Sequence, residues 1–184
     1  MPHLRHVGLV GTNGSGKSTA CTFFKDQGYT VVSLSDALRK YVISKHLPMD
    51  RDTLTNTANA LKDERGADVL AQIVMENIDT ASFPVAFDSI RNEAELLYLK
   101  KRGVFFIGIT APIDVRYQRV IKRKRETDAI DFDTFLRQDQ RENEGQSKGQ
   151  NIHLTLKKCD INCENSGSVA EFYDVLTAIV KEHL

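Results

Sequence analysis

Residues Gly11-Thr12-Asn13-Gly14-Ser15-Gly16-Lys17-Ser18 match the pattern G-x-x-x-x-G-K-[ST] of a phosphate-binding loop. An apolar run at 7–10 precedes this loop, and helix-compatible residues at 18–25 follow it, so it is predicted to join a buried strand to a helix. Glycines let such a loop turn until its backbone N–H groups converge on phosphate oxygens, and the helix dipole adds positive potential. The loop therefore predicts nucleoside-triphosphate binding, with Lys17 reaching the β- and γ-phosphates and the Ser18 hydroxyl holding Mg²⁺. The predicted cofactor-binding residues here are Gly11, Asn13, Gly14, Ser15, Gly16, Lys17, Ser18 and Thr19.

Strand and helix patterns alternate along the rest of the chain. Further strands are predicted at 29–34, 84–87, 104–109 and 160–163. Helices are predicted at 36–44 with Ser35 or Asp36 as N-cap, at 53–78 with a break near Gly66, at 92–101, from Pro112 onward, at 131–144 and at 168–182. This order predicts a three-layer α/β/α fold around a five-stranded, mostly parallel sheet.

Composition limits the class of protein. The 184 residues suit one domain, and 25 Lys and Arg balance 25 Asp and Glu, which argues against a globally basic nucleic-acid binder. Three cysteines (Cys21, Cys159 and Cys163) form no disulfide framework, which suits a reducing compartment. Cys159 and Cys163 could be two metal ligands, but the favoured interpretation is small buried apolar residues. With no apolar run of membrane-spanning length and no signal peptide, we expect a cytoplasmic protein.

An acidic residue ends the predicted strand at 84–87. Asp88 follows the apolar run, and such a carboxylate beside a phosphate loop can orient the hydration shell of Mg²⁺. Many strands end in Asp without any function, but the combination with the phosphate loop favours a metal-binding role.

Arginines after strand ends indicate what the bound nucleotide is for. Arg39 and Arg91 follow two predicted strands, where α/β sheets hold their ligands. Six of the ten residues at 116–125 are basic, namely Arg116, Arg119, Lys122, Arg123, Lys124 and Arg125. Three interpretations remain open for this segment: a phosphate clamp in a lid, which is favoured, a solvated helix face, or a nucleic-acid contact. The chain lacks N-K-x-D, so a guanine-specific switch is not indicated.

Taken together, these motifs resemble the nucleoside-monophosphate kinases of the adenylate-kinase and dephospho-CoA-kinase superfamily. Four segments besides the phosphate loop carry the resemblance: Asp36-Ala37-Leu38-Arg39, Asp88-Ser89-Ile90-Arg91, Ala111-Pro112 with Arg116 and Arg119, and Asn165-Ser166-Gly167-Ser168. The nearest group is a set of small dephospho-CoA-kinase-like proteins with a D-G-V-R-like motif at the second segment. The single Asp36 departs from the D-x-D of dephospho-CoA kinases and favours a nucleotide acceptor.

The resemblance implies roles by position. Arg39 and Arg91 would grip the phosphate of the acceptor, while Arg119, Arg123 and Arg125 would close over the triphosphate. Asn165 and Gly167 would lie near the adenine. Asp36 would be either a general base that orients the acceptor or merely a helix N-cap. The charged helix carrying Arg137, Asp139 and Arg141 is interpreted as a solvated face.

The leading hypothesis is an ATP- and Mg²⁺-dependent phosphotransferase acting on a small phosphorylated acceptor, a (deoxy)nucleoside monophosphate or dephospho-CoA. Its core would be 1–47, 82–115 and 155–184, with an acceptor-binding cap at 48–81 and a lid at 116–150. The catalytic residues would be Lys17, Asp36, Asp88, Arg119 and Arg123; substrate would also contact Arg39, Arg91 and Arg125. The alternative is a nucleotide-binding regulatory ATPase without kinase activity. Neither a membrane nor a nucleic acid is expected as partner.

Overall fold

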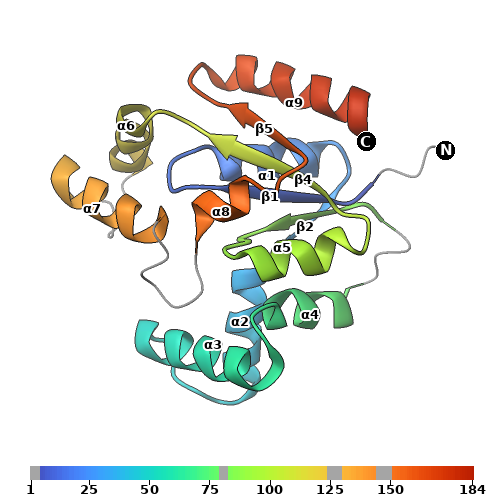
Figure 1. The fold of residues 1–184 in the computed structure, drawn as a ribbon, viewed down its shortest axis with the longest axis vertical. Helices are drawn as coiled ribbons and strands as arrows, with labels where there is room; N and C mark the ends of the chain where they lie inside the picture. Colours follow the sequence, from blue (N-terminus) through green and yellow to red (C-terminus); the bar gives the residue numbers. More distant parts are fainter. Residues whose placement is uncertain (1–4, 79–82, 124–129, 144–150) are drawn as a thin grey trace.

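Five parallel strands form the centre of the computed structural model, which describes residues 5–78, 83–123, 130–143 and 151–184 (Figure 1). They are β1 (Val7–Gly11), β2 (Thr30–Ser33), β3 (Val85–Asp88), β4 (Phe105–Thr110) and β5 (Ile161–Glu164), in the spatial order β2-β3-β1-β4-β5. Every neighbouring pair is parallel, and β1 lies at the centre between β3 and β4. The predicted α/β/α fold with its five-stranded parallel sheet is confirmed.

Helices cover both faces of this sheet. One face carries α1 (Lys17–Asp26) and α9 (Val169–His183), and the other carries α2 (Leu34–Ser44), α4 (Val69–Glu76) and α5 (Glu93–Lys100) (Figure 1). Helix α3 (Arg51–Arg65) packs on α2 and α4, farther from the sheet. The remaining helices are α6 (Ile113–Arg123), α7 (Phe132–Asn143) and the short α8 (Ile152–Leu156). None of the helices in the described residues combines the length and the hydrophobicity that a membrane span requires.

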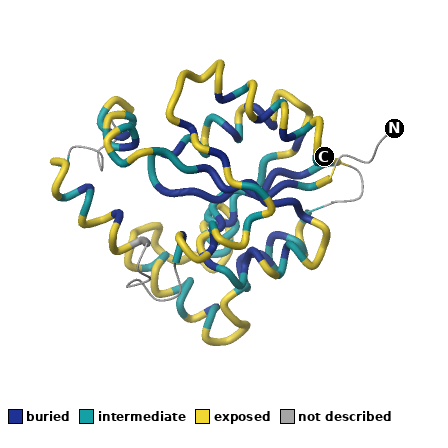
Figure 2. Tube along the Cα trace, turned by 45° about the horizontal axis from the view of Figure 1, so that its top comes forward, coloured by how far each residue is buried: buried dark blue, intermediate teal, exposed yellow. Residues whose placement is uncertain are grey.

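Successive side chains of β1 supply two separate cores. Val7 and Leu9 pack toward α1 and α9, in a cluster that includes Phe24 and Leu176, while Val10 packs on the opposite side with the cluster of α2, α4 and α5. All five residues of β1 are buried, as Figure 2 shows for the strands at the centre of the molecule. Because both faces are covered, the strand is a continuous apolar run in the sequence.

The helix boundaries differ from the sequence-based expectation in two places. The N-cap of α2 is Ser33, whose hydroxyl accepts from the Asp36 amide at 3.4 Å, so the assignment of Ser35 or Asp36 as cap is wrong. The helix starts at Leu34, whose side chain is fully buried in the core formed with α4 and α5. Helix α8 was not predicted, since five residues are too few to show helical periodicity. The predicted break near Gly66 is confirmed as the end of α3.

Candidate active site

The phosphate loop is held between two other segments, and its glycines make this approach possible. Gly14 has φ +79, and a Cβ there would lie 2.6 Å from the carbonyl oxygen of Arg116 in α6. Gly16 has φ +109, and a Cβ there would collide with the amide nitrogen of Asn165 after β5. Both positions therefore require glycine for backbone conformation and for space. The loop is packed against the backbone of α6 and the side chain of Asn165 rather than lying free on the surface.

Lys17 lies at the mouth of this loop. Its Nζ donates to the carbonyl oxygens of Gly11 at 2.6 Å and Thr12 at 3.0 Å, and it lines a cavity of about 260 Å³. The first turn of α1 contains no acidic residue and no side-chain cap, so its amides and helix dipole keep a positive potential beside the ammonium. This cavity has the charge and the donors that an anionic phosphate chain requires.

Asp88 ends β3, the strand next to β1. Its Oδ2 accepts from the Ser89 hydroxyl at 3.3 Å, while its Oδ1 is buried and has no hydrogen-bond partner among the described residues. A buried carboxylate oxygen without a partner is costly, which makes this atom suited to receive a cation. Ser18 stands exposed in the first turn of α1. A carboxylate and a hydroxyl are oxygen ligands of the kind Mg²⁺ uses, so these two residues fit that ion.

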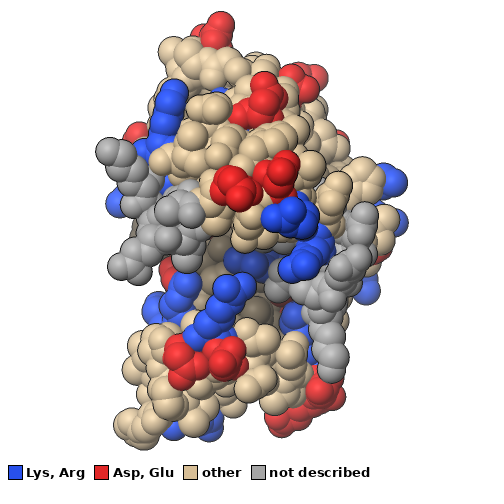
Figure 3. Space-filling model, turned by 90° about the vertical axis from the view of Figure 1, so that its left-hand side faces the viewer, with Lys and Arg blue, Asp and Glu red and all other residues tan. Residues whose placement is uncertain are grey.

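A second cavity of about 400 Å³ adjoins the first. Three cationic side chains line it, Arg39 from α2, Lys62 from α3 and Arg91 from the segment after β3. Ser89 and Arg91 line both cavities, so the two spaces meet at these residues. Figure 3 shows Lys and Arg side chains gathered around a hollow on this side of the molecule. The structure thus brings Arg39 and Arg91 together, and Lys62 is a cation that sequence reasoning missed.

Arg91 is anchored by a buried carboxylate that the sequence analysis also missed. Glu95 accepts from the backbone amides of Arg91 at 2.9 Å and Asn92 at 3.4 Å and forms a capping box with Asn92 at the start of α5. Burial raises the pKa of the Glu95 carboxyl, which the hydrogen bond from the Arg91 amide partly opposes. The spacing Asn92-x-x-Glu95 before an apolar run is a capping signature, so it was the signal available in the sequence.

Asp36 lies apart from both cavities. Its carboxylate pairs with Arg39 at 2.7 Å, the two side chains are 62% and 52% exposed, and Asp36 lines a separate groove beside β2, α2 and α4. The structure therefore associates Asp36 with Arg39 and does not bring it to Lys17.

The arginines of α6 contact the phosphate loop and the segment after β5. Arg119 donates to the carbonyls of Asn165 at 2.8 Å and Gly167 at 3.2 Å, and the Asn165 amide donates to the Ser15 carbonyl at 2.9 Å. Arg123 donates to the side chain of Asn13 at 3.1 Å. Arg119 and Asn165 thus form a bridge from α6, through the segment after β5, to the phosphate loop. Arg123 instead contacts the loop through the side chain of Asn13. Arg125 lies outside the described residues.

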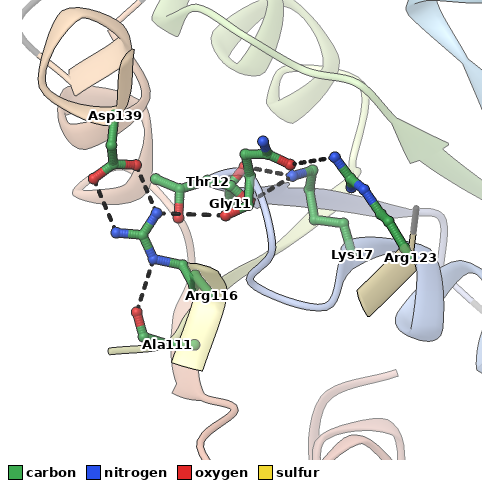
Figure 4. Close-up of polar contacts among 8 residues, drawn as sticks. Gly11, Thr12, Lys17, Ala111, Arg116, Arg123 and Asp139 are labelled. Carbon is green, nitrogen blue, oxygen red and sulfur yellow. Dashed lines mark hydrogen bonds and ion pairs between the residues drawn. The ribbon is translucent and has the colours of Figure 1, made fainter. Parts of the chain in front are cut away.

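Arg116 and Asp139 form a buried ion pair next to the loop (Figure 4). Two parallel hydrogen bonds of 2.6 and 2.9 Å join them, and Arg116 also donates to the carbonyls of Ala111 at 3.0 Å and Asn13 at 3.4 Å. Arg116 is 6% and Asp139 7% exposed. The interpretation of α7 as a solvated face is therefore wrong at Asp139, which shares the inner face of the helix with the buried Phe135.

Burial makes the cysteine beside the loop a poor nucleophile. Burial, reinforced by the charge of Asp88, raises the pKa of the Cys21 thiol to about 12, although Lys17 acts in the opposite direction. At pH 8 its thiolate population should be about 10³-fold smaller than that of an ordinary cysteine. We expect iodoacetamide to alkylate Cys21 at least about 100-fold more slowly in the folded protein than in urea, as measured by peptide mass spectrometry. Equal rates in the two states would contradict this environment.

Comparison with known sequences identifies the family of the chain. A family model described as an AAA domain matches residues 7–149. A UPF0200 protein of Methanoculleus marisnigri is 29% identical over 180 residues, with 96% of each chain covered. A UPF0200 protein of Saccharolobus islandicus is 30% identical over 138 residues, covering 73% of this chain and 72% of that protein.

Solved structures share the fold. TT1252 from Thermus thermophilus superposes with a TM-score of 0.67 at 21% identity, with 99% of both chains covered. Shikimate kinase from Acinetobacter baumannii, in complex with shikimate, gives 0.58 at 14% identity, covering 98% of this chain and 96% of that one. Dephospho-CoA kinase from Campylobacter jejuni gives 0.52 at 14% identity, covering 97% and 96%. At these identities the likeness concerns the fold alone.

Proposed function

Since the chain belongs to the AAA domain family of P-loop NTPases, we propose that it is an ATP- and Mg²⁺-dependent kinase of a small phosphorylated acceptor. One observation carries the proposal: the cavity at the phosphate loop and the cation-lined cavity meet at Ser89 and Arg91. A regulatory ATPase needs the first cavity, but only a transferase needs a second anion site that adjoins it. The resemblance to nucleotide kinases and the presence of kinases among proteins of the same fold support this choice.

On the donor side, the phosphate chain of ATP would lie along the loop amides and the first turn of α1. Lys17 would exchange its bonds to the loop carbonyls for phosphate oxygens, and Arg123 would approach from above the loop. Ser18 and Asp88 would hold Mg²⁺, which when bound neutralises charge on the phosphates. The bridge of Arg119 and Asn165 would keep the loop in place against α9 and support the adenine side.

On the acceptor side, Arg39 and Arg91 would bind the phosphate of the acceptor, with Asp36 orienting the guanidinium of Arg39. Arginine suits this work because its planar fork binds phosphate with two hydrogen bonds. A cavity of about 400 Å³ falls in the size range of small-molecule sites. The acceptor we favour is a ribo- or deoxyribonucleoside monophosphate, with dephospho-CoA as the alternative. Arg125 is proposed as a further lid contact.

Transfer in such a site depends on placement and on cations. The transferring phosphoryl group carries charge on its equatorial oxygens, so fixed cations that face it in a water-poor cavity lower the barrier. Lys17 and Arg91 line the cavity at the phosphate loop, and Arg123 binds the side chain of Asn13, which lines the same cavity. Closing α3 and α6 over this space would exclude water and limit futile hydrolysis of ATP.

The variant Arg91→Ala tests whether the acceptor and ATP are bound by different residues of the site. Loss of a charged hydrogen-bond donor should weaken acceptor binding about 10- to 100-fold while ATP affinity changes less than about 3-fold. Calorimetric titration with ATP and with each acceptor measures both constants. Arg102→Ala is the matched control, because Arg102 is exposed at the other end of α5, where it stacks on Tyr98. Loss of ATP affinity with acceptor binding intact would contradict the proposed division of roles.

A further inference from the structure

Ser89 has a backbone conformation that its residue type disfavours. Its φ is +64, and only one other non-glycine residue in the described parts of the chain, His46, has a positive φ. A side chain in this left-handed region is strained, and such strain persists where the surroundings enforce it, often at functional sites. Ser89 follows Asp88 directly and lines both cavities. The strain therefore lies at the point where donor and acceptor would meet.

The Ser89 hydroxyl is the middle of a chain of hydrogen bonds. The Asp36 amide donates to Ser33 Oγ at 3.4 Å, Ser33 Oγ donates to Ser89 Oγ at 3.1 Å, and Ser89 Oγ donates to Asp88 Oδ2 at 3.3 Å. Hydrogen bonds in series polarise one another and fix the direction of each donor. This series of hydrogen bonds connects the first turn of α2, the helix that also carries Arg39, to the carboxylate of Asp88 at the end of β3.

One carboxylate oxygen of Asp88 thus accepts a hydrogen bond, and the other accepts none from the described residues. Because Ser89 binds Oδ2, the carboxylate of Asp88 is held with Oδ1 buried and without a partner among the described residues. Without the Ser89 hydroxyl, the carboxylate could rotate and share either oxygen with other donors. The left-handed backbone at Ser89 turns the chain away after β3 and keeps this hydroxyl against Asp88.

We propose that Ser89 is a positioning residue whose hydroxyl, held between Ser33 and Asp88 by a strained backbone, aims the free oxygen of Asp88 at the metal ion of a bound nucleotide. The proposal rests on the proposed nucleotide and metal site, but it concerns metal-dependent binding rather than transfer to an acceptor. It also explains why a position whose backbone favours glycine carries a serine, since glycine would relieve the strain and lose the hydroxyl.

Two substitutions separate the effect of the backbone strain at Ser89 from the effect of its hydroxyl group. Ser89→Gly removes both, so its Tm should stay equal or rise by up to about 3 °C, whereas Ser89→Ala keeps the strain and should not gain stability. Both variants should lose most of the gain in nucleotide affinity that Mg²⁺ provides. The measured quantity is the ratio of Kd for a fluorescent ATP analogue in EDTA to its Kd in Mg²⁺. We expect this ratio to fall at least about 5-fold in both variants, with Kd in EDTA within about 2-fold of the parent protein.

His46→Gly is the matched control. It relieves the second strained position, which lies exposed after α2, so its Tm should move as in Ser89→Gly while the Kd ratio stays at the parent value. The proposal is overturned if either Ser89 variant keeps the parent ratio, if the loss is equal in EDTA and Mg²⁺, or if the parent protein shows no Mg²⁺ dependence. A protein that binds nucleotide but phosphorylates no acceptor would refute the proposed kinase activity and leave the Ser89 result standing, so the two failures are distinguishable.

Discussion

Lys17→Ala is expected to reduce phosphoryl transfer at least about 10²- to 10³-fold while the protein stays folded. Lys17 is the one lysine of the phosphate loop. Removing a single group that stabilises developing charge lowers the rate by about 10²- to 10³-fold in comparable sites. Two of the hydrogen bonds of Lys17 go to carbonyls of its own loop, and their loss should lower the free energy of unfolding by about 1–3 kcal/mol. Product formation by mass spectrometry and thermal melting by circular dichroism measure the two effects.

Lys25→Ala is the control for this prediction, since Lys25 lies exposed in the last turn of the same helix. It should keep parent activity and stability. Near-normal turnover of the Lys17 variant would refute the assignment of the phosphate loop.

Asp139→Ala is expected to destabilise the fold by about 3–5 kcal/mol, a fall in Tm of about 10 °C or more. The cause is not the lost attraction alone. Arg116 would remain buried between α6, α7 and the phosphate loop with its charge uncompensated. Because Arg116 also binds the Asn13 carbonyl, the loop should lose order, and nucleotide affinity should fall with stability.

Two further variants test this explanation by thermal melting. Replacing both partners, Arg116→Met with Asp139→Leu, should restore part of the stability lost by Asp139→Ala, because no buried charge is left alone. Asp133→Ala in the exposed first turn of α7 should cost less than about 1 kcal/mol. An Asp139→Ala protein that melts within about 2 °C of the parent would show that the pair does not hold the loop.

Local patterns predicted the fold well. The glycine loop, the apolar run before it and the strand-helix alternation were enough for a five-stranded parallel sheet, because each depends on residues near in sequence. The cap of α2 was misassigned because Ser33, Ser35 and Asp36 are all good caps, so residue type alone does not decide among them.

Contacts between residues that are distant in sequence could not be predicted in the same way. Arg116 and Asp139 are 23 residues apart in sequence, and nothing in their spacing says that a basic segment and a charged helix would bury one ion pair. A partial signal existed, because Phe132, Phe135 and Asp139 recur at helical spacing and thus share a face. Lys62 and Ser89 were missed because their importance comes from cavities formed by several elements.

Phosphoryl transfer from ATP to a small phosphorylated acceptor is the activity that the two adjoining cavities support. The direct measurement incubates the protein with ATP and Mg²⁺ and, separately, each ribo- and deoxyribonucleoside monophosphate and dephospho-CoA, and reads all products by mass spectrometry. We expect at least one acceptor to gain one phosphoryl group as ATP becomes ADP, and this product to disappear with Lys17→Ala. Accumulation of ADP and inorganic phosphate with every acceptor unchanged would contradict it.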